Sequence, residues 1–149
     1  MYTQTQVTSG GEQSPSIELL KLITAYWGSQ AVWVFAKLGI ADLLKDGPQT
    51  TVHVAAQTRT HEASLYRLLR ALATLGLLTE LDGARFELKA MGASLRTDVP
   101  GSMRTPAVMF AEPWFWNTWG GLLHTVSTGQ PAFDHVYGMP FFDYQLNLL

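Results

Sequence analysis

The apolar positions in the first third of the chain recur at helical spacing. Ser14-Pro15 supplies a hydroxyl N-cap followed by proline at the first helical position, which favours the start of a helix. From Ile17 to Leu38 apolar residues follow at intervals of three and four, but near Trp33 they occupy almost every side. Such a helix needs cover all round, and in a short chain a second subunit is a natural cover. Gly39 predicts its end, and Ile40 to Leu44 predicts one further short helix.

The middle third predicts a winged helix, that is, two helices joined by a turn and followed by a β-hairpin. A short helix is expected over Thr51–Gln57, and a strongly amphipathic one carries a leucine stripe from Leu65 to Leu75. Strands are expected over Leu77–Leu81 and Ala84–Leu88. Asp82-Gly83 between them is typical of a two-residue hairpin turn.

The last third predicts helices interrupted by proline and glycine. Met103–Ala111 has a helical pattern that Glu112-Pro113 interrupts, because proline breaks the backbone ladder. Trp114–Val126 predicts a single helix with one apolar stripe, which Ser127 to Pro131 closes. Phe133–Tyr144 is rich in aromatic residues and is broken by Gly138 and Pro140.

Composition narrows the class of protein. A chain of 149 residues buries one compact core, and its five Trp, seven Phe and five Tyr suit cores, interfaces and ligand pockets. The formal net charge of −2 gives no basic field for nucleic acid. The absence of cysteine removes disulfide and thiolate chemistry and fits a cytoplasmic protein. We expect no membrane span, because the uncharged stretch Pro113–Phe133 is too polar and too broken.

Ordered motifs along most of the chain resemble one family. Ala36 to Leu44 resembles the dimerisation helix of the plant-type S-adenosylmethionine (SAM)-dependent small-molecule O-methyltransferases, and Leu65 to Leu78 is similar to their winged-helix core. Phe86-Glu87-Leu88 and the residues up to Ser102 look like the wing and the linker after it. The segment from Trp119 to Tyr144, with Thr128-Gly129 and Tyr137-Gly138-Met139, resembles the family's pocket-side helix and following loop.

The resemblance implies a fold and a division of the chain. The expected fold class is mainly α, a winged-helix-like helical domain with a small β-hairpin that forms an intertwined dimer. Residues 1–13 are expected to be a disordered tail, 14–100 the helical dimerisation and winged-helix domain, and 101–149 the pocket-side helices that lead to an absent SAM-binding domain. In the family that domain holds SAM and the catalytic base, so we expect no cofactor on this chain alone, and no methyl transfer by it. A homodimer through residues 17–44 is the implied partner.

An aromatic set supplies the candidate substrate wall. By resemblance to the family's substrate-facing positions, the candidates are Met109, Phe110, Phe115, Trp116 and Phe141. Rings and a thioether suit a flat aromatic or polyketide-like ligand, although the same residues also suit plain core packing. Tyr26 and Trp27 are weaker candidates, for which we favour an interface.

The histidines offer weaker chemistry. No catalytic residue is assigned; His124, in an uncharged aromatic helix, is a weak candidate for a base, and a hydrogen-bonded core or interface histidine is the alternative. Asp134-His135 could form an acid–base pair, but a solvent-facing loop pair is the favoured interpretation. No metal site is expected, because no two histidines have useful helical spacing and no cysteine is present.

Two other functions remain open from the residues. A stand-alone, cofactor-free cyclase, isomerase or small-molecule binding protein would use the pocket, with His124 or Asp134 handling protons. A winged-helix DNA-binding regulator would use Arg67 and Arg70, although a solvated polar face is favoured for this pair. The first hypothesis remains the dimerisation and substrate-capping domain of an O-methyltransferase, with a separate SAM-binding domain as a candidate partner.

Overall fold

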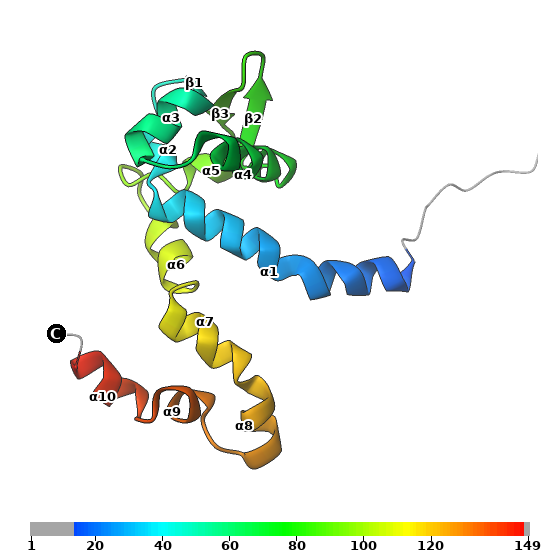
Figure 1. Cartoon of the computed structure of the whole chain (residues 1–149), viewed down its shortest axis with the longest axis vertical. Helices are drawn as coiled ribbons and strands as arrows, with labels where there is room; N and C mark the ends of the chain where they lie inside the picture. The colour runs from blue at the N-terminus through cyan, green and yellow to red at the C-terminus, as the bar shows by residue number, and fades with distance from the viewer. Residues whose placement is uncertain (1–13, 148–149) are drawn as a thin grey trace, which may run out of the picture.

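A long helix dominates the first part of the structure. The computed structural model describes residues 14–147, so the predicted tail at 1–13 lies outside the described residues. Helix α1 (Pro15–Lys37) begins with proline in its first turn and extends away from the rest of the molecule (Figure 1). Gly39 ends it in the left-handed conformation, with φ of 66°, and α2 (Ile40–Leu43) follows. Both elements agree with the sequence pattern.

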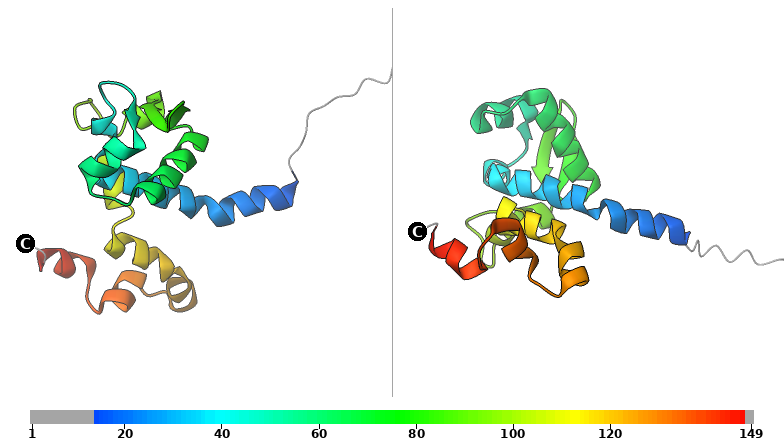
Figure 2. Two further views of the ribbon diagram at one scale, coloured as in Figure 1. Left: turned by 45° about the horizontal axis from the view of Figure 1, so that its top comes forward. Right: turned by 60° about the horizontal axis from the view of Figure 1, so that its bottom comes forward.

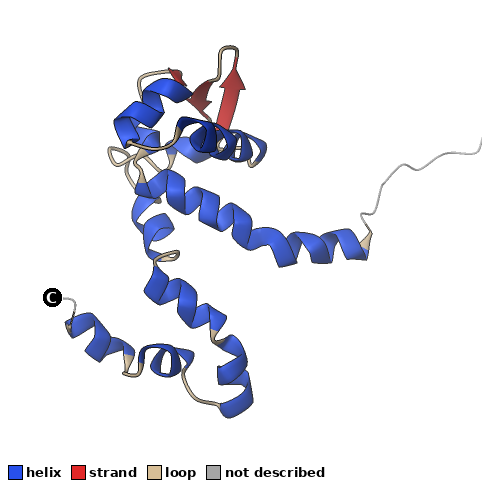
Figure 3. Ribbon diagram, in the orientation of Figure 1, coloured by secondary structure: helices blue, strands red, loops and turns tan. Residues whose placement is uncertain are grey.

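The middle third forms the predicted winged helix with one additional strand. Its elements are β1 (Gln49–Thr50), α3 (Thr51–Thr58), α4 (Glu62–Thr74), β2 (Leu78–Leu81), β3 (Arg85–Leu88) and α5 (Ala90–Ala93). The antiparallel sheet has the order β1-β3-β2 and lies apart from the later helices (Figure 3). Strand β1 has two residues, too few to produce an alternating pattern, so it was not predicted.

The hairpin turn differs from the predicted two-residue form. Leu81 pairs with Arg85, which leaves three residues in the loop. Gly83 and Ala84 both have positive φ, 75° and 53°. The Ala84 carbonyl accepts bonds from the amide and hydroxyl of Thr51, each at 3.0 Å. These bonds from α3 hold a non-glycine residue in the left-handed region, a tertiary effect that the dipeptide Asp82-Gly83 does not encode.

The hydrophobic core lies within the winged-helix part and the adjoining end of α1. Fourteen buried apolar residues between Phe35 and Leu95 form one cluster. Phe35, Ile40, Leu69, Leu72 and Phe86 are completely buried in it. Leu65, Leu69 and Leu72 of the predicted stripe therefore face this core as their spacing predicts, whereas Leu75 follows the end of α4 and is 47% exposed.

The last third is a chain of short helices that leaves this core. Its elements are α6 (Arg104–Met109), α7 (Pro113–Gly120), α8 (Leu122–Thr128), α9 (Ala132–Tyr137) and α10 (Phe141–Leu146), which turn back on themselves in Figure 2. The single helix predicted over Trp114–Val126 is wrong, because Gly121 divides it. A Cβ at Gly121 would lie 3.0 Å from Cβ of Ala132, so glycine permits the close approach of α9. Within 14–147, no helix has the length and apolarity to cross a bilayer.

Arg104 joins α6 to the first part of the structure. Its Nε donates to the carbonyl oxygen of Ala36 at 3.0 Å, and its Nη1 donates to Oδ2 of Asp42 at 3.3 Å. The other oxygen of Asp42 accepts the backbone amide of Thr97 at 2.8 Å. The guanidinium therefore ties the end of α1, α2 and the linker to the start of the pocket-side helices.

Candidate functional site

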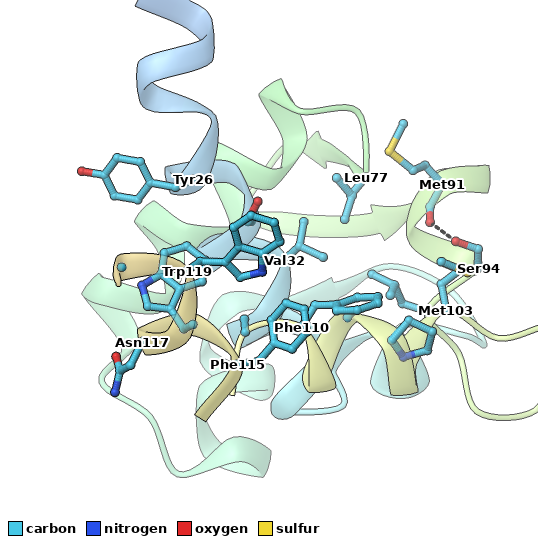
Figure 4. A pocket seen from close by; sticks show the side chains of 17 residues that line it. Tyr26, Val32, Leu77, Met91, Ser94, Met103, Phe110, Phe115, Asn117 and Trp119 are labelled. Atoms are coloured by element: carbon cyan, nitrogen blue, oxygen red, sulfur yellow. Dashed lines mark hydrogen bonds between the residues drawn. The ribbon is translucent and has the colours of Figure 1, made fainter. Parts of the chain in front are cut away.

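An aromatic groove lies between α1 and the α6–α7 corner. Its volume is about 1040 Å³, and its lining includes Tyr26 and Val32 from α1 and Phe110, Phe115, Trp116 and Trp119 from the later helices. Figure 4 shows Tyr26, Phe110, Phe115 and Trp119 on one side of the cavity, with Met91 and Ser94 at its far end. A mainly apolar concavity of this size is the usual form of a small-molecule site.

The structure divides the predicted substrate set between two cavities. Phe110, Phe115 and Trp116 line the large groove. Met109 and Phe141, again with Phe115, line a second cavity of about 420 Å³ behind α7. Phe115 therefore separates the two spaces. Met109 also borders a third, more polar cavity of about 520 Å³, beside Arg104 and Glu112.

Ring contacts connect the groove with α1. The centroids of Phe110 and Phe115 lie 5.0 Å apart in an edge-to-face arrangement. Tyr26 contacts Trp116 at 6.4 Å, so one predicted interface residue also belongs to the groove. Trp27 points elsewhere: it is 62% exposed and does not line the groove. Tyr26 and Trp27 therefore have different surroundings, which could not be predicted from their adjacent positions in the sequence.

The groove has no formal charge on its walls. Among the described residues that line it, none is Asp, Glu, Lys, Arg or His. Two basic side chains of α1 and α6 are engaged with carboxylates: Lys37 pairs with Glu112, and Arg104 pairs with Asp42. The wall thus offers shape, aromatic surface and a few hydroxyl or amide groups, but no acid or base.

The histidine candidates meet each other away from the groove. The rings of His124 and His135 stack with centroids 3.9 Å apart and an angle of 7° between planes. Nε2 of His124 lies 3.4 Å from Oγ1 of Thr128. The expectation of a loop pair at Asp134-His135 is wrong, because both residues belong to α9. His124 lines none of the three cavities, so the structure does not bring it to a substrate.

The histidine pair was missed because it is a contact between helices rather than a spacing within one. Thr128 to Pro131 reverses the chain, so residues eleven positions apart come face to face. Parallel stacked rings do not direct their nitrogens at a common ion. No group of three His, Cys, Asp or Glu side chains suited to a metal occurs in the described part of the chain.

The second winged-helix element carries its arginines in an ion network. Arg70 pairs with Glu80 at 3.3 Å, and the Tyr66 hydroxyl donates to the same carboxylate at 2.7 Å. This hydrogen bond to Glu80 raises the pKa of Tyr66 above its ordinary value. Arg67 lies 3.4 Å from Ser64. The carboxylate of Glu80 reduces the positive potential that a phosphate backbone would need.

A winged helix joined to a long helix whose first half exposes apolar side chains has the features of a dimerisation module. A family model described as the O-methyltransferase dimerisation domain matches residues 20–98, more than half of the chain. The protein belongs to this family.

Full-length relatives share the same architecture. The phenazine O-methyltransferase PhzM of Lysobacter antibioticus is 40% identical over 126 residues, which are 85% of this chain and 37% of that protein. The crystal structure of LaPhzM has a TM-score of 0.84 at 39% identity and covers 89% of this chain and 40% of that one. The chain therefore spans about two fifths of the length of these relatives.

A third relative concerns the cofactor. NcsB1 from neocarzinostatin biosynthesis, solved with SAM and 2-hydroxy-5-methyl naphthoic acid, has a TM-score of 0.67 at 32% identity, covering 78% of this chain and 36% of that one. The described residues of our chain do not fit SAM. Nowhere between residues 14 and 147 does a strand lead through a glycine-rich turn into a helix, the unit that cradles such cofactors.

Proposed function

We propose that the chain is the dimerisation and substrate-capping domain of a SAM-dependent O-methyltransferase that acts on a hydroxyl of a small aromatic or polyketide-like molecule. Residues 14–100 serve dimerisation and scaffold, and residues 101–149 supply the pocket-side helices. The complete enzyme uses SAM, and the groove forms one wall of its substrate pocket. The observation that carries the capping role is the uncharged aromatic groove within a domain of this family.

The dimer role is supported by the apolar surface of α1. In the single chain Leu19, Leu22 and Ile23 are 58%, 76% and 60% exposed, and Trp27 is 62% exposed. Phe35, Ala36 and Ile40 are instead buried in the chain's own core. Within the predicted interface at 17–44, the first half of α1 is therefore the part available to a second copy. Burial of this much apolar surface favours association.

The substrate-wall role gives each predicted residue a place. Phe110, Phe115 and Trp116 present ring faces or edges to the groove, where a flat ligand would stack. Met109 and Phe141 line the second cavity and not the groove, so in this proposal they belong to the region behind the wall rather than to its surface.

The experiment is equilibrium dialysis of the full 149-residue chain with phenazine, a neutral tricyclic probe chosen because the phenazine enzyme is a relative. Saturable binding is expected, and Trp116→Ala is expected to weaken it about tenfold, since stacking on a large ring is removed. Phe142→Ala is the matched control, because Phe142 is 78% exposed and lies outside the groove. Equal loss in both variants, or no saturable binding, would contradict the capping role.

A methyl-transfer assay separates this proposal from catalysis by the chain alone. We expect no transfer from SAM to a phenolic acceptor by the purified chain, since its groove holds no base. Turnover would overturn the assignment as a capping domain. No specific observation supports the cofactor-free cyclase, because His124 lies outside the cavities. None supports the DNA-binding regulator either, because Arg70 is paired with Glu80.

A further inference from the structure

The charge of the groove wall bears on which aromatic molecules it accepts. Seventeen side chains from five parts of the chain line the groove, and none of them is charged. The polar members are hydroxyl and amide groups, among them Ser29, Ser94 and Asn117. Ser94 already donates to the carbonyl oxygen of Met91 at 2.7 Å, so it is not a free donor for an anion.

Two basic side chains from the elements that form this wall, Lys37 of α1 and Arg104 of α6, are paired with carboxylates. Lys37 is held by Glu112, and the guanidinium of Arg104 is shared between Asp42 and the Ala36 carbonyl. Recruiting either cation to a ligand would leave a carboxylate or a carbonyl without its partner, which costs free energy. The wall therefore cannot repay the lost hydration of an anionic ligand with a local ion pair.

We propose that the groove selects neutral, flat polycyclic acceptors and discriminates against their carboxylated forms. The inference rests on the proposed function, because it concerns the ligand of the same groove. Its volume of about 1040 Å³ leaves room for a flat polycyclic ligand. The edge-to-face pair of Phe110 and Phe115 and the indole of Trp116 provide ring surface at one end.

The test compares two ligands that differ in charge but hardly in shape. Phenazine-1-carboxamide and phenazine-1-carboxylate have the same ring system, and only the second is ionised at pH 7.5. In calorimetric titration of the full chain, the carboxamide is expected to bind at least about tenfold more tightly, since burial of an unpaired carboxylate is penalised. Unsubstituted phenazine is expected to bind like the carboxamide.

A reciprocal variant introduces the missing charge. Met91 lines the groove, is 58% exposed and has an unbranched side chain, so Met91→Lys places an ammonium group there with little change in shape. The affinity for the carboxylate is expected to rise about threefold, as for a solvent-accessible ion pair. The carboxamide is titrated in parallel, and the ratio of the two affinities is compared between the variant and the unmodified chain, so that a general effect of the substitution on the groove cancels. Val52→Lys adds the same charge at a 59% exposed position on α3, away from the groove, and is expected to alter neither affinity.

The outcomes separate this inference from the proposed function. Equal or tighter binding of the carboxylate would overturn charge selection and leave the groove as a ligand site. Failure of all three phenazines to bind would overturn both, and would locate the error in the capping role itself. An equal gain for the carboxylate in Met91→Lys and Val52→Lys would assign the effect to net charge and contradict a role for the groove lining.

Discussion

The winged-helix part and the α7–α10 helices are built with similar amounts of apolar sequence but bury it very differently. The core cluster lies entirely between Phe35 and Leu95, with many side chains fully inaccessible. In α7–α10 only Ala132 and Phe133 are buried among the described residues, whereas Leu123 and Val126 are 77% and 76% exposed. The first region stabilises itself. The second region, like the start of α1, exposes apolar surface that another subunit or domain can cover.

The strongest way to test this difference is to remove one phenylalanine from each region. Phe86→Ala empties a fully buried position and is expected to reduce the free energy of unfolding by about 3–5 kcal/mol. Phe142→Ala acts on a ring that is 78% exposed and is expected to change it by less than about 0.5 kcal/mol. Urea denaturation followed by circular dichroism measures both. Comparable losses would show that α10 contributes to the same cooperative core.

The winged-helix part could be predicted well from the sequence, because the burial of its side chains follows the local spacing of apolar residues. The leucine stripe of α4 faces the core, and Gly39 ends α1 where predicted. The stretch around Trp33, apolar on nearly every side, was expected to need a second subunit as cover, but Phe35 and Ala36 in it are buried in the chain's own core. The exposed apolar residues Leu22 and Ile23 lie earlier on α1, so a cover from outside stays a prediction for that half of the helix.

The remaining details depend on contacts between elements, which periodicity does not encode. Ala84 is left-handed because Thr51 holds its carbonyl, so the hairpin loop has three residues. Gly121 divides the predicted long helix where α9 approaches. The substrate set stays a prediction, and a linear pattern could not show that Met109 and Phe141 line a different cavity from the large groove. It also could not show the stacked pair of His124 and His135.

A second test asks whether the exposed half of α1 is covered by another copy. Leu22→Asp places a carboxylate at a position that is 76% exposed in the single chain. If that position is buried in a homodimer, the dissociation constant is expected to rise about a hundredfold, because the charge loses hydration and the leucine contacts are lost. Sedimentation velocity over a concentration series measures this constant. Val52→Asp, at a position 59% exposed on α3, is the control that should leave it unchanged.

A pair of glycines sharpens the contrast in packing density. A Cβ at Gly92 in α5 would lie 2.2 Å from the carbonyl oxygen of Leu77, so Gly92→Ala forces a backbone shift and is expected to cost about 1–3 kcal/mol. At Gly120 in α7 nothing lies within 4 Å of the same atom. Gly120→Ala is therefore expected to stabilise the chain by up to about 1 kcal/mol, through the unfolded state. Thermal unfolding compares the two, and a loss at Gly120 would reveal packing against α7 that a single chain lacks.

The smallest expected effect concerns the linker between the two regions. The guanidinium of Arg96 donates to both oxygens of Asp98, at 2.9 and 2.7 Å, and these hydrogen bonds hold the pKa of Asp98 below its ordinary value. Because the folded-state pKa is depressed, this stabilisation is present above the unfolded pKa of about 3.9 and is lost as the pH falls through the folded value.

Arg96→Gln should return the pKa of Asp98 towards its ordinary value in a carboxyl NMR titration. Lys45 lowers the same pKa more weakly, so Lys45→Gln should produce a smaller rise. Since both members of the pair are solvent-accessible, Arg96→Gln should scarcely change the urea concentration at the midpoint of unfolding at pH 7. A large loss of stability in this variant would mean that the linker, rather than Arg104, couples the two regions.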